Sequence, residues 1–176
     1  VATWQAALAS LTSVSADGTL TVTVGLRDDA GNVGTQNTGT VIGDTITPYV
    51  TTVNIYNQTE NSYSSVGNGA VVSISATVED TNKGIIDASD VTANLLDLGF
   101  GTEVSADSYD QATGIATWQS AMTALTSVST DGTLTVTVGL RDDAGNVGTQ
   151  NTGTIIGDTI APYVSSVNIY NQTENS

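Results

Sequence analysis

Acidic side chains of this chain gather in a few turns, and carboxylates are groups that bind hard cations. Glu79 and Asp80 end one alternating segment, and Asp142 and Asp143 open a later turn. Calcium takes about six to eight oxygen ligands, mainly from carboxylates and carbonyls. These turns therefore predict a calcium site, and seven residues are its candidate ligands: Asp80, Asp87, Asp90, Asp142, Asp143, Asn146 and Asp158.

The turn that begins at Asp142 has a second interpretation. Its sequence, Asp-Asp-Ala-Gly-Asn, suits a hairpin, because Asp and Asn side chains accept backbone N–H bonds and Gly145 tolerates positive φ. The sequence contains no Asp-x-Asp-x-Asp-Gly loop of the kind that marks a helix-flanked calcium site. Both interpretations predict a tight turn, and only the first adds a metal.

Two Asn-Gln-Thr triplets fit the acceptor pattern for N-glycosylation. They begin at Asn57 and Asn171, each at the end of a predicted strand. We expect a transferase to reach these positions, because strand ends lie at the surface. Asn57 and Asn171 are therefore candidate glycosylation sites.

The composition disfavours catalysis. The chain has no Cys and no His, so it lacks a thiol nucleophile, an imidazole base and the usual ligands of zinc. Asp142 and Asp143 are a pair of carboxylates, which glycosidases use, but neighbouring residues at a strand end point in different directions. We therefore expect a protein that is not an enzyme.

The charge balance limits the partners. Lys and Arg number three against 18 Asp and Glu, which gives a formal net charge of −15. Such a surface repels phosphate backbones and anionic lipid headgroups, so nucleic acid is not an expected partner. No apolar run of about 18 residues is present, so no membrane insertion is expected in this segment. Scarcity of Lys and Arg also removes sites for trypsin-like proteases, which suits an extracellular protein.

Alternation of apolar and polar residues predicts the elements that position these groups. In residues 132–140 Leu and Val fall on one side and Thr on the other, and residues 70–80 repeat the pattern. Turns rich in Gly, Asn and Asp separate these segments. The fold class is therefore all-β, an antiparallel β-sandwich with Trp4 and Trp118 in the core, and further strands are predicted at residues 49–58, 91–98, 114–119 and 149–157.

The chain contains a long internal repeat. Residues 1–62 return as residues 115–176, at an offset of 114 positions and with ten substitutions, all of them mild. A repeat of this length has the size of an independent domain. We expect a section of a longer polypeptide with three parts: the C-terminal part of one repeat in residues 1–45, a complete repeat in residues 46–159 and the first strand of the next repeat in residues 160–176.

Three short segments resemble tandem immunoglobulin-like repeats of bacterial and archaeal surface proteins. They are Asp-Thr-Ile-Ala-Pro at residues 158–162, Val-Gly-Leu-Arg-Asp-Asp-Ala-Gly-Asn-Val at residues 138–147, and Ser-Asp-Val-Thr-Ala-Asn-Leu-Leu-Asp-Leu at residues 89–98. The resemblance implies immunoglobulin-like modules at a microbial cell surface, as in adhesins, surface layers and filaments.

These observations predict an extracellular structural repeat that forms a stalk, filament or surface-layer assembly, with calcium at its joints. The alternative is an adhesin module that recognises sugar or protein through loops around Phe100 and Tyr109. The expected partners are neighbouring repeats or subunits of the same protein. Were the 176 residues a whole subunit, we would expect strand donation between subunits, with residues 163–171 as the donor.

Overall fold

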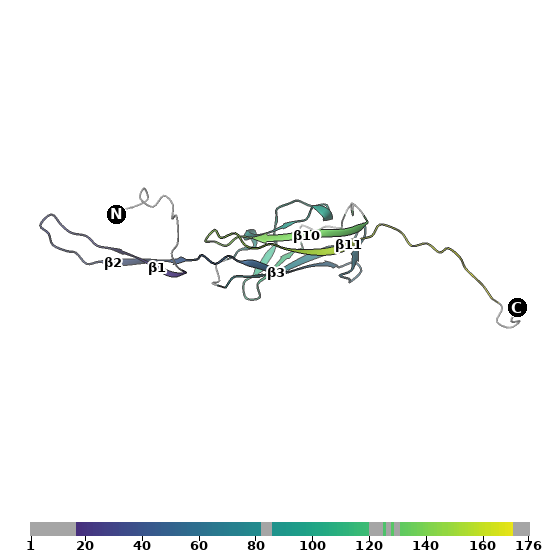
Figure 1. Ribbon diagram of the computed structural model, residues 1–176, viewed down its shortest axis with the longest axis horizontal. Helices are drawn as coiled ribbons and strands as arrows, with labels where there is room; N and C mark the ends of the chain where they lie inside the picture. Colours follow the sequence, from purple (N-terminus) through teal and green to yellow (C-terminus); the bar gives the residue numbers. More distant parts are fainter. Residues whose placement is uncertain (1–16, 82–85, 120–124, 126–127, 129–130, 171–176) are drawn as a thin grey trace.

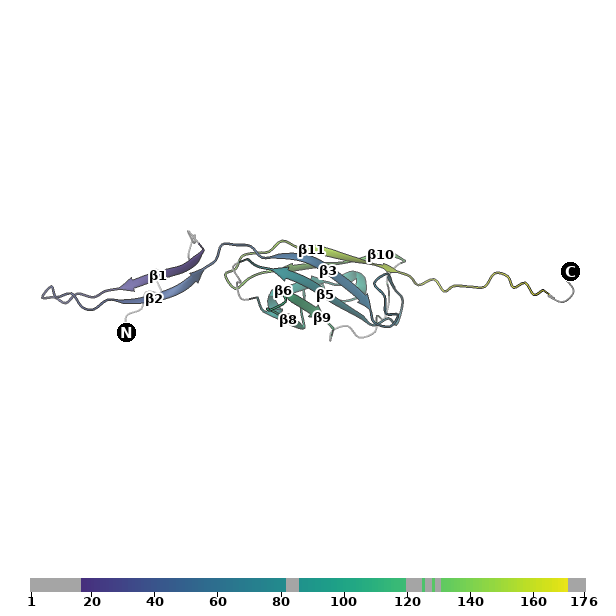
Figure 2. The same ribbon diagram turned by 90° about the horizontal axis from the view of Figure 1, so that it is seen from below.

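The computed structural model describes residues 17–81, 86–119, 125, 128 and 131–170, and these residues form an all-β structure. Strands β1 (Gly18–Val24) and β2 (Asn37–Gly43) make a separate hairpin. The hairpin is joined by one extended segment to a nine-stranded body (Figure 1). Residues 160–170 extend from the opposite end of that body (Figure 2).

The body consists of two sheets. One sheet has the strand order β3-β5-β9-β8, and all of its pairs are antiparallel. The other has the order β4-β11-β10-β6-β7, in which β4 pairs parallel to β11 and the remaining pairs are antiparallel. The strands are β3 (Tyr49–Asn57), β4 (Ser65–Val66), β5 (Val72–Glu79), β6 (Val91–Asn94), β7 (Val104–Ser105), β8 (Ser108–Asp110), β9 (Ile115–Trp118), β10 (Gly132–Leu140) and β11 (Asn151–Gly157).

Alternating apolar side chains of both sheets meet in one core, as the sequence pattern predicts. The inward residues of β5 and β10 are buried together with Trp118, which is fully buried. The indole Nε1 of Trp118 donates to the carbonyl oxygen of Val104 at 2.9 Å, so its only polar atom is satisfied inside the core. The prediction of an all-β fold with antiparallel sheets is therefore confirmed, while Trp4 lies outside the described residues.

One predicted strand is shorter than expected. The segment 91–98 forms a strand only as far as Asn94, and a 3-10 turn, η3 (Leu96–Leu98), follows it. The side-chain oxygen of Asn94 accepts the backbone N–H of Leu96 at 3.2 Å, which turns the chain out of the sheet. The turn ends at Gly99, whose φ of +84° suits glycine. A second 3-10 turn, η2 (Ala88–Asp90), precedes β6.

The hairpin β1–β2 is a copy of β10–β11, and no described strand outside it faces it. Its register pairs Leu20 with Val41, and the register of β10–β11 pairs Leu134 with Ile155, the corresponding residues one repeat later. Burial differs greatly, because Leu140 is 6% exposed and its counterpart Leu26 is 67% exposed. The same local sequence therefore forms the same strand pairing in both places. Among the described residues, its apolar face is covered only where strands of a second sheet lie against it.

Gly153 in β11 provides a test of how closely the two sheets pack. A Cβ at this position would lie 2.6 Å from the carbonyl oxygen of Val53 in β3, whereas a Cβ on its counterpart Gly39 would meet nothing within 4 Å. We expect Gly153→Ala to lower the free energy of unfolding by about 1–3 kcal/mol, since backbone must move. Gly39→Ala, the matched control, is expected to leave it unchanged. Urea unfolding followed by Trp118 fluorescence measures both, and equal effects would contradict the close packing.

Candidate metal site at the joint

The segment between β2 and β3, residues 44–48, is the joint of the molecule, and hydrogen bonds hold it from both sides. On the hairpin side, the backbone N–H and the hydroxyl of Thr45 donate to one carboxylate oxygen of Asp17, at 2.6 and 2.7 Å. On the sandwich side, the side-chain amide of Asn146 donates to the carbonyl oxygens of Asp44 and Ile46, at 3.2 and 3.3 Å. The joint is therefore attached to both bodies by polar contacts.

The turn between β10 and β11 supplies the contact on the sandwich side. Asp142 Oδ1 accepts the backbone N–H of Asn146, and Asp142 Oδ2 accepts its side-chain amide, both at 2.8 Å. Asp28 and Asn32, the corresponding residues of the hairpin, make the same two bonds at the same distance. The hairpin interpretation of this turn is therefore confirmed as a local property of the sequence. Burial is not local, because Asp142 is 3% exposed while Asp28 is exposed.

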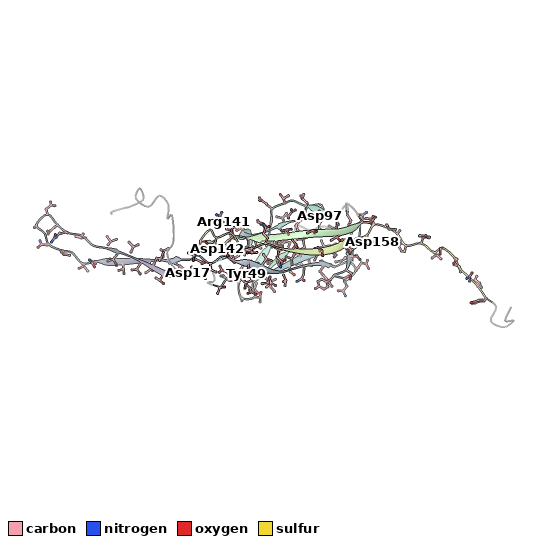
Figure 3. The ribbon with its side chains drawn as sticks, in the orientation of Figure 1. Asp17, Tyr49, Asp97, Arg141, Asp142 and Asp158 are labelled. Atoms are coloured by element: carbon pink, nitrogen blue, oxygen red, sulfur yellow. The ribbon has the colours of Figure 1, made fainter. Side chains whose placement is uncertain are left out.

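Three carboxylates meet where the joint reaches the sandwich. Asp44 comes from the joint, Asp80 follows β5, and Asp142 lies in the turn after β10. One oxygen of each lies within 4.8 Å of the other two. Figure 3 shows Asp142 at the end of the sandwich nearest the hairpin. Residues far apart in the sequence therefore form one group of acids.

Asp44 has a buried oxygen with no partner. Its Oδ1 accepts the backbone N–H of Ile46 at 2.9 Å. Its Oδ2 is buried and has no hydrogen bond among the described residues, and the residue as a whole is 9% exposed. An unpaired carboxylate oxygen is costly away from water, and nearby negative charges add repulsion. A divalent cation removes both penalties, so these three side chains fit a metal ion and can hold one.

The structure places some of the predicted ligands in the acidic group and others outside it. Asp80 and Asp142 belong to the acidic group, and Asn146 hydrogen-bonds to its members. Asp87 and Asp90 lie outside it, because Asp90 accepts the backbone N–H of Asp87 at 2.8 Å and closes η2. Two more predicted ligands, Asp143 and Asp158, also lie outside the group and are exposed.

Asp44 is a candidate ligand that the sequence pattern did not single out, although the repeat contains the signal. Asp44 is the counterpart of Asp158, one repeat earlier. Asp158 lies at the far end of the sandwich from Asp142 (Figure 3). The acidic residue of a joint therefore groups with the unit that follows it, and Asp44 rather than Asp158 faces Asp80 and Asp142.

The accessibility expected at Asn57 is wrong for the folded sandwich. Asn57 is 1% exposed, and its side-chain nitrogen donates to the carbonyl oxygen of Ser65 at 2.9 Å. Its side-chain oxygen accepts the backbone N–H groups of Thr59 and Glu60. These hydrogen bonds fix the loop after β3, so the side-chain amide of Asn57 is not available to a transferase. Asn171 lies outside the described residues.

The loops around Phe100 and Tyr109, which the alternative function would use, each place an aromatic side chain partly in the core. Phe100 and Tyr109 are partly buried and pack against the buried residues of the sandwich. Burial raises the pKa of Tyr109, and the charges of Asp80 and Asp110 add to this increase. A hollow of about 350 Å³ lies beside Tyr109 and includes Asp80 and Thr113 in its wall.

The hydrogen bonds of Asp17 recur at Asp131, which predicts a measurable titration shift. The backbone N–H and then the hydroxyl of Thr159 hold the pKa of Asp131 below its ordinary value of 3.8. Because the folded-state pKa is lowered, this contact contributes stability above the unfolded-state pKa and loses it as the pH falls through the folded-state value. We expect Thr159→Val to return the pKa of Asp131 partway toward 3.8. Carboxyl NMR titration measures it, and an unchanged pKa would contradict the contact.

No family model, no curated protein and no solved structure matches this chain. Among the described residues, no helix has the length and apolar character required to cross a membrane.

Proposed function

We propose that this chain is an extracellular structural repeat, in which immunoglobulin-like sandwiches joined head to tail form a stalk, filament or surface layer of a microbial cell. Calcium at each joint fixes one unit against the next. The observation that carries the proposal is the joint itself, where Asp44 meets Asp80 and Asp142 of the following sandwich. The chemistry of such a protein is assembly and spacing rather than catalysis.

The strand order supports the immunoglobulin-like assignment. One sheet of an immunoglobulin domain has the order A-B-E-D and the other contains G-F-C. Here the order β3-β5-β9-β8 corresponds to A-B-E-D, and β11-β10-β6 corresponds to G-F-C. The short strand β4 follows β3 in the chain but pairs with β11 of the opposite sheet, in a parallel orientation. It therefore continues the first strand of the sandwich, β3, on the other sheet.

Repetition of the joint supports a structural role. Asp17 accepts two hydrogen bonds from Thr45, and Asp131 accepts two from Thr159, with distances of 2.6 and 2.7 Å in each pair. Beyond the second joint, residues 163–170 repeat the sequence of β3 almost unchanged and lie exposed. In our proposal they become the first strand of another sandwich, supplied either by the same chain or by a neighbouring subunit.

The donor set favours calcium among metals. The three side chains offer only carboxylate oxygens, which suit hard cations and not the softer metals that prefer Cys or His. Backbone carbonyl oxygens and water complete calcium shells in other proteins, and calcium tolerates irregular geometry better than magnesium. Extracellular calcium modules work with dissociation constants of about 10⁻⁴–10⁻³ M. A site of three carboxylates suits that range.

A fusion of the chain to its own repeat tests the proposal. Residues 63–176 follow Ser62, and residues 1–62 match residues 115–176, so adding a second copy of 63–176 after Ser176 continues the pattern. The fusion holds two complete sandwiches with one joint between them. We expect small-angle X-ray scattering to show one extended shape in 10 mM calcium, roughly tenfold or more above the dissociation constant. In chelator we expect a broader distribution of shapes.

Asp158→Asn in this fusion removes the joint carboxylate of the middle site. We expect its scattering in calcium to resemble that of the unsubstituted fusion in chelator. Asp143→Asn removes one exposed carboxylate outside the acidic group and is the control for net charge. Identical scattering with and without calcium for the unsubstituted fusion would refute calcium stiffening. A compact particle in both conditions would refute the head-to-tail arrangement.

A further inference from the structure

We infer that Asp17 is a positioning residue for the metal site of the following sandwich, so that metal affinity at each joint depends on how the preceding unit holds the linker. This inference rests on the proposed function. Asp17 is not a member of the acidic group. It acts through Thr45, the immediate neighbour of Asp44.

Asp44 is held between two contacts on the hairpin side. Gly43 pairs with Gly18 at the end of the β1–β2 ladder, and Thr45 donates two hydrogen bonds to Asp17. Asp44 lies between these two anchored residues, so its backbone position is set by the preceding unit. This explains how a residue of an extended joint is directed into the next sandwich.

The sandwich holds the other face of the same residue. The side-chain amide of Asn146 donates to the carbonyl oxygen of Asp44 and also to Asp142 Oδ2. One amide therefore connects two of the three acidic residues. The unpartnered, buried Oδ2 of Asp44 is an independent sign that a cation belongs here, because it has no hydrogen bond among the residues that the structure describes.

Removing the Asp17 contact releases the joint on one side. The linker then samples more conformations, and metal binding must order it again, which lowers the affinity. Residues that orient metal ligands through hydrogen bonds typically change affinity by about 10–100-fold when they are substituted. Because Asp17 is exposed and acts through a neighbouring residue, we expect loss of its contact to lower the metal affinity by an amount at the lower end of this range, about tenfold.

The repeat supplies a matched control. Asp131 makes the same two hydrogen bonds to Thr159 at the second joint. In the 176-residue chain, Asp158 at that joint is exposed and lies outside the acidic group. Asp131→Ala therefore removes the same hydrogen bonds as Asp17→Ala, at a joint whose own aspartate lies outside the acidic group.

Calorimetric titration of the 176-residue chain with calcium tests the inference. We expect Asp17→Ala, which leaves Thr45 without its acceptor, to raise the dissociation constant about tenfold and Asp131→Ala to leave it within about twofold of the wild type. Thr45→Val, which keeps the backbone hydrogen bond, is expected to give a smaller increase. Thr45→Ser keeps both donors and is expected to restore wild-type affinity. Trp118 fluorescence checks that the sandwich stays folded in every variant.

The outcomes separate the inference from the proposal on which it rests. If wild type binds calcium and Asp17→Ala binds it equally well, the positioning role fails while the calcium site stands. If Asp17→Ala and Asp131→Ala weaken binding equally, the effect is one of net charge and the positioning role fails again. If the wild type binds no calcium at millimolar concentration, both the calcium site and the positioning role are overturned.

Discussion

Asp44→Asn is expected to abolish the increase in melting temperature that calcium gives the sandwich. If the proposed site has a dissociation constant of about 10⁻⁴ M, 10 mM calcium is expected to stabilise the wild type by about 2.7 kcal/mol. For a domain of this size that corresponds to an increase of about 10 °C. The substitution removes the one ligand that the joint supplies, so we expect the calcium-dependent shift to fall to about 2 °C or less. Differential scanning calorimetry in calcium and in chelator measures both.

The same variant has a second expected signature in chelator. The wild type buries a carboxylate oxygen without a partner beside two other acidic groups. An amide at this position carries no charge, so Asp44→Asn relieves repulsion when no metal is present. We therefore expect its melting temperature in chelator to equal or exceed that of wild type. A variant that loses the calcium response because its sandwich is damaged would melt at a lower temperature instead.

Asp158→Asn is the matched control for this experiment in the 176-residue chain. Asp158 has the same local sequence and makes the same contact, since its Oδ1 accepts the backbone N–H of Ile160 at 3.0 Å. It is exposed and lies outside the acidic group. We expect Asp158→Asn to keep the full calcium response. Loss of the response in both variants would contradict a site built around Asp44.

Leu140→Ala is expected to lower the free energy of unfolding by about 2–5 kcal/mol, since it removes a buried side chain and leaves a cavity. Leu140 is 6% exposed, at the end of β10. Leu26, the same residue of the repeat in the hairpin, is 67% exposed. We expect Leu26→Ala to change the free energy by no more than about 0.5 kcal/mol. Urea unfolding of the 176-residue chain compares the two.

The difference between Leu140→Ala and Leu26→Ala measures how much packing against the facing sheet stabilises the fold, because the two leucines have the same neighbours in sequence. Equal destabilisation by both substitutions would mean that the hairpin face is covered, contrary to the structure. In the two-sandwich fusion we expect Leu140→Ala to keep its full effect, because the strands around β10 are unchanged. The difference between Leu140 and Leu26 therefore reports tertiary burial rather than the propensity of the strand.

Several features of the site were predictable from the sequence because they depend on neighbouring residues. The Asp-Asp-Ala-Gly-Asn turn makes the same hydrogen bonds in the exposed hairpin and in the sandwich. The alternation in residues 132–140 predicts a strand that the structure contains as β10. Asp80 and Asp142 were candidate ligands because acids cluster at strand ends, and both lie in the acidic group.

Other features depended on contacts between distant residues. Asn57 fits an acceptor triplet, yet it is buried, because the loop after β3 folds back over it and uses its amide. Asp87 and Asp90 looked like calcium ligands and instead close a 3-10 turn. The sequence of a glycosylation triplet or of an acidic cluster does not determine how the chain folds around it.

The sequence by itself determined strands, turns, the repeat and the absence of thiol and imidazole chemistry, because these follow from residue types and from contacts a few positions apart. Only the tertiary structure decided that Asp44, and not its counterpart Asp158, faces Asp80 and Asp142. The two aspartates have the same local sequence and the same local hydrogen bond. They differ in what lies beyond them, because the sandwich that follows Asp44 brings its own acids to the joint and buries the carboxylate.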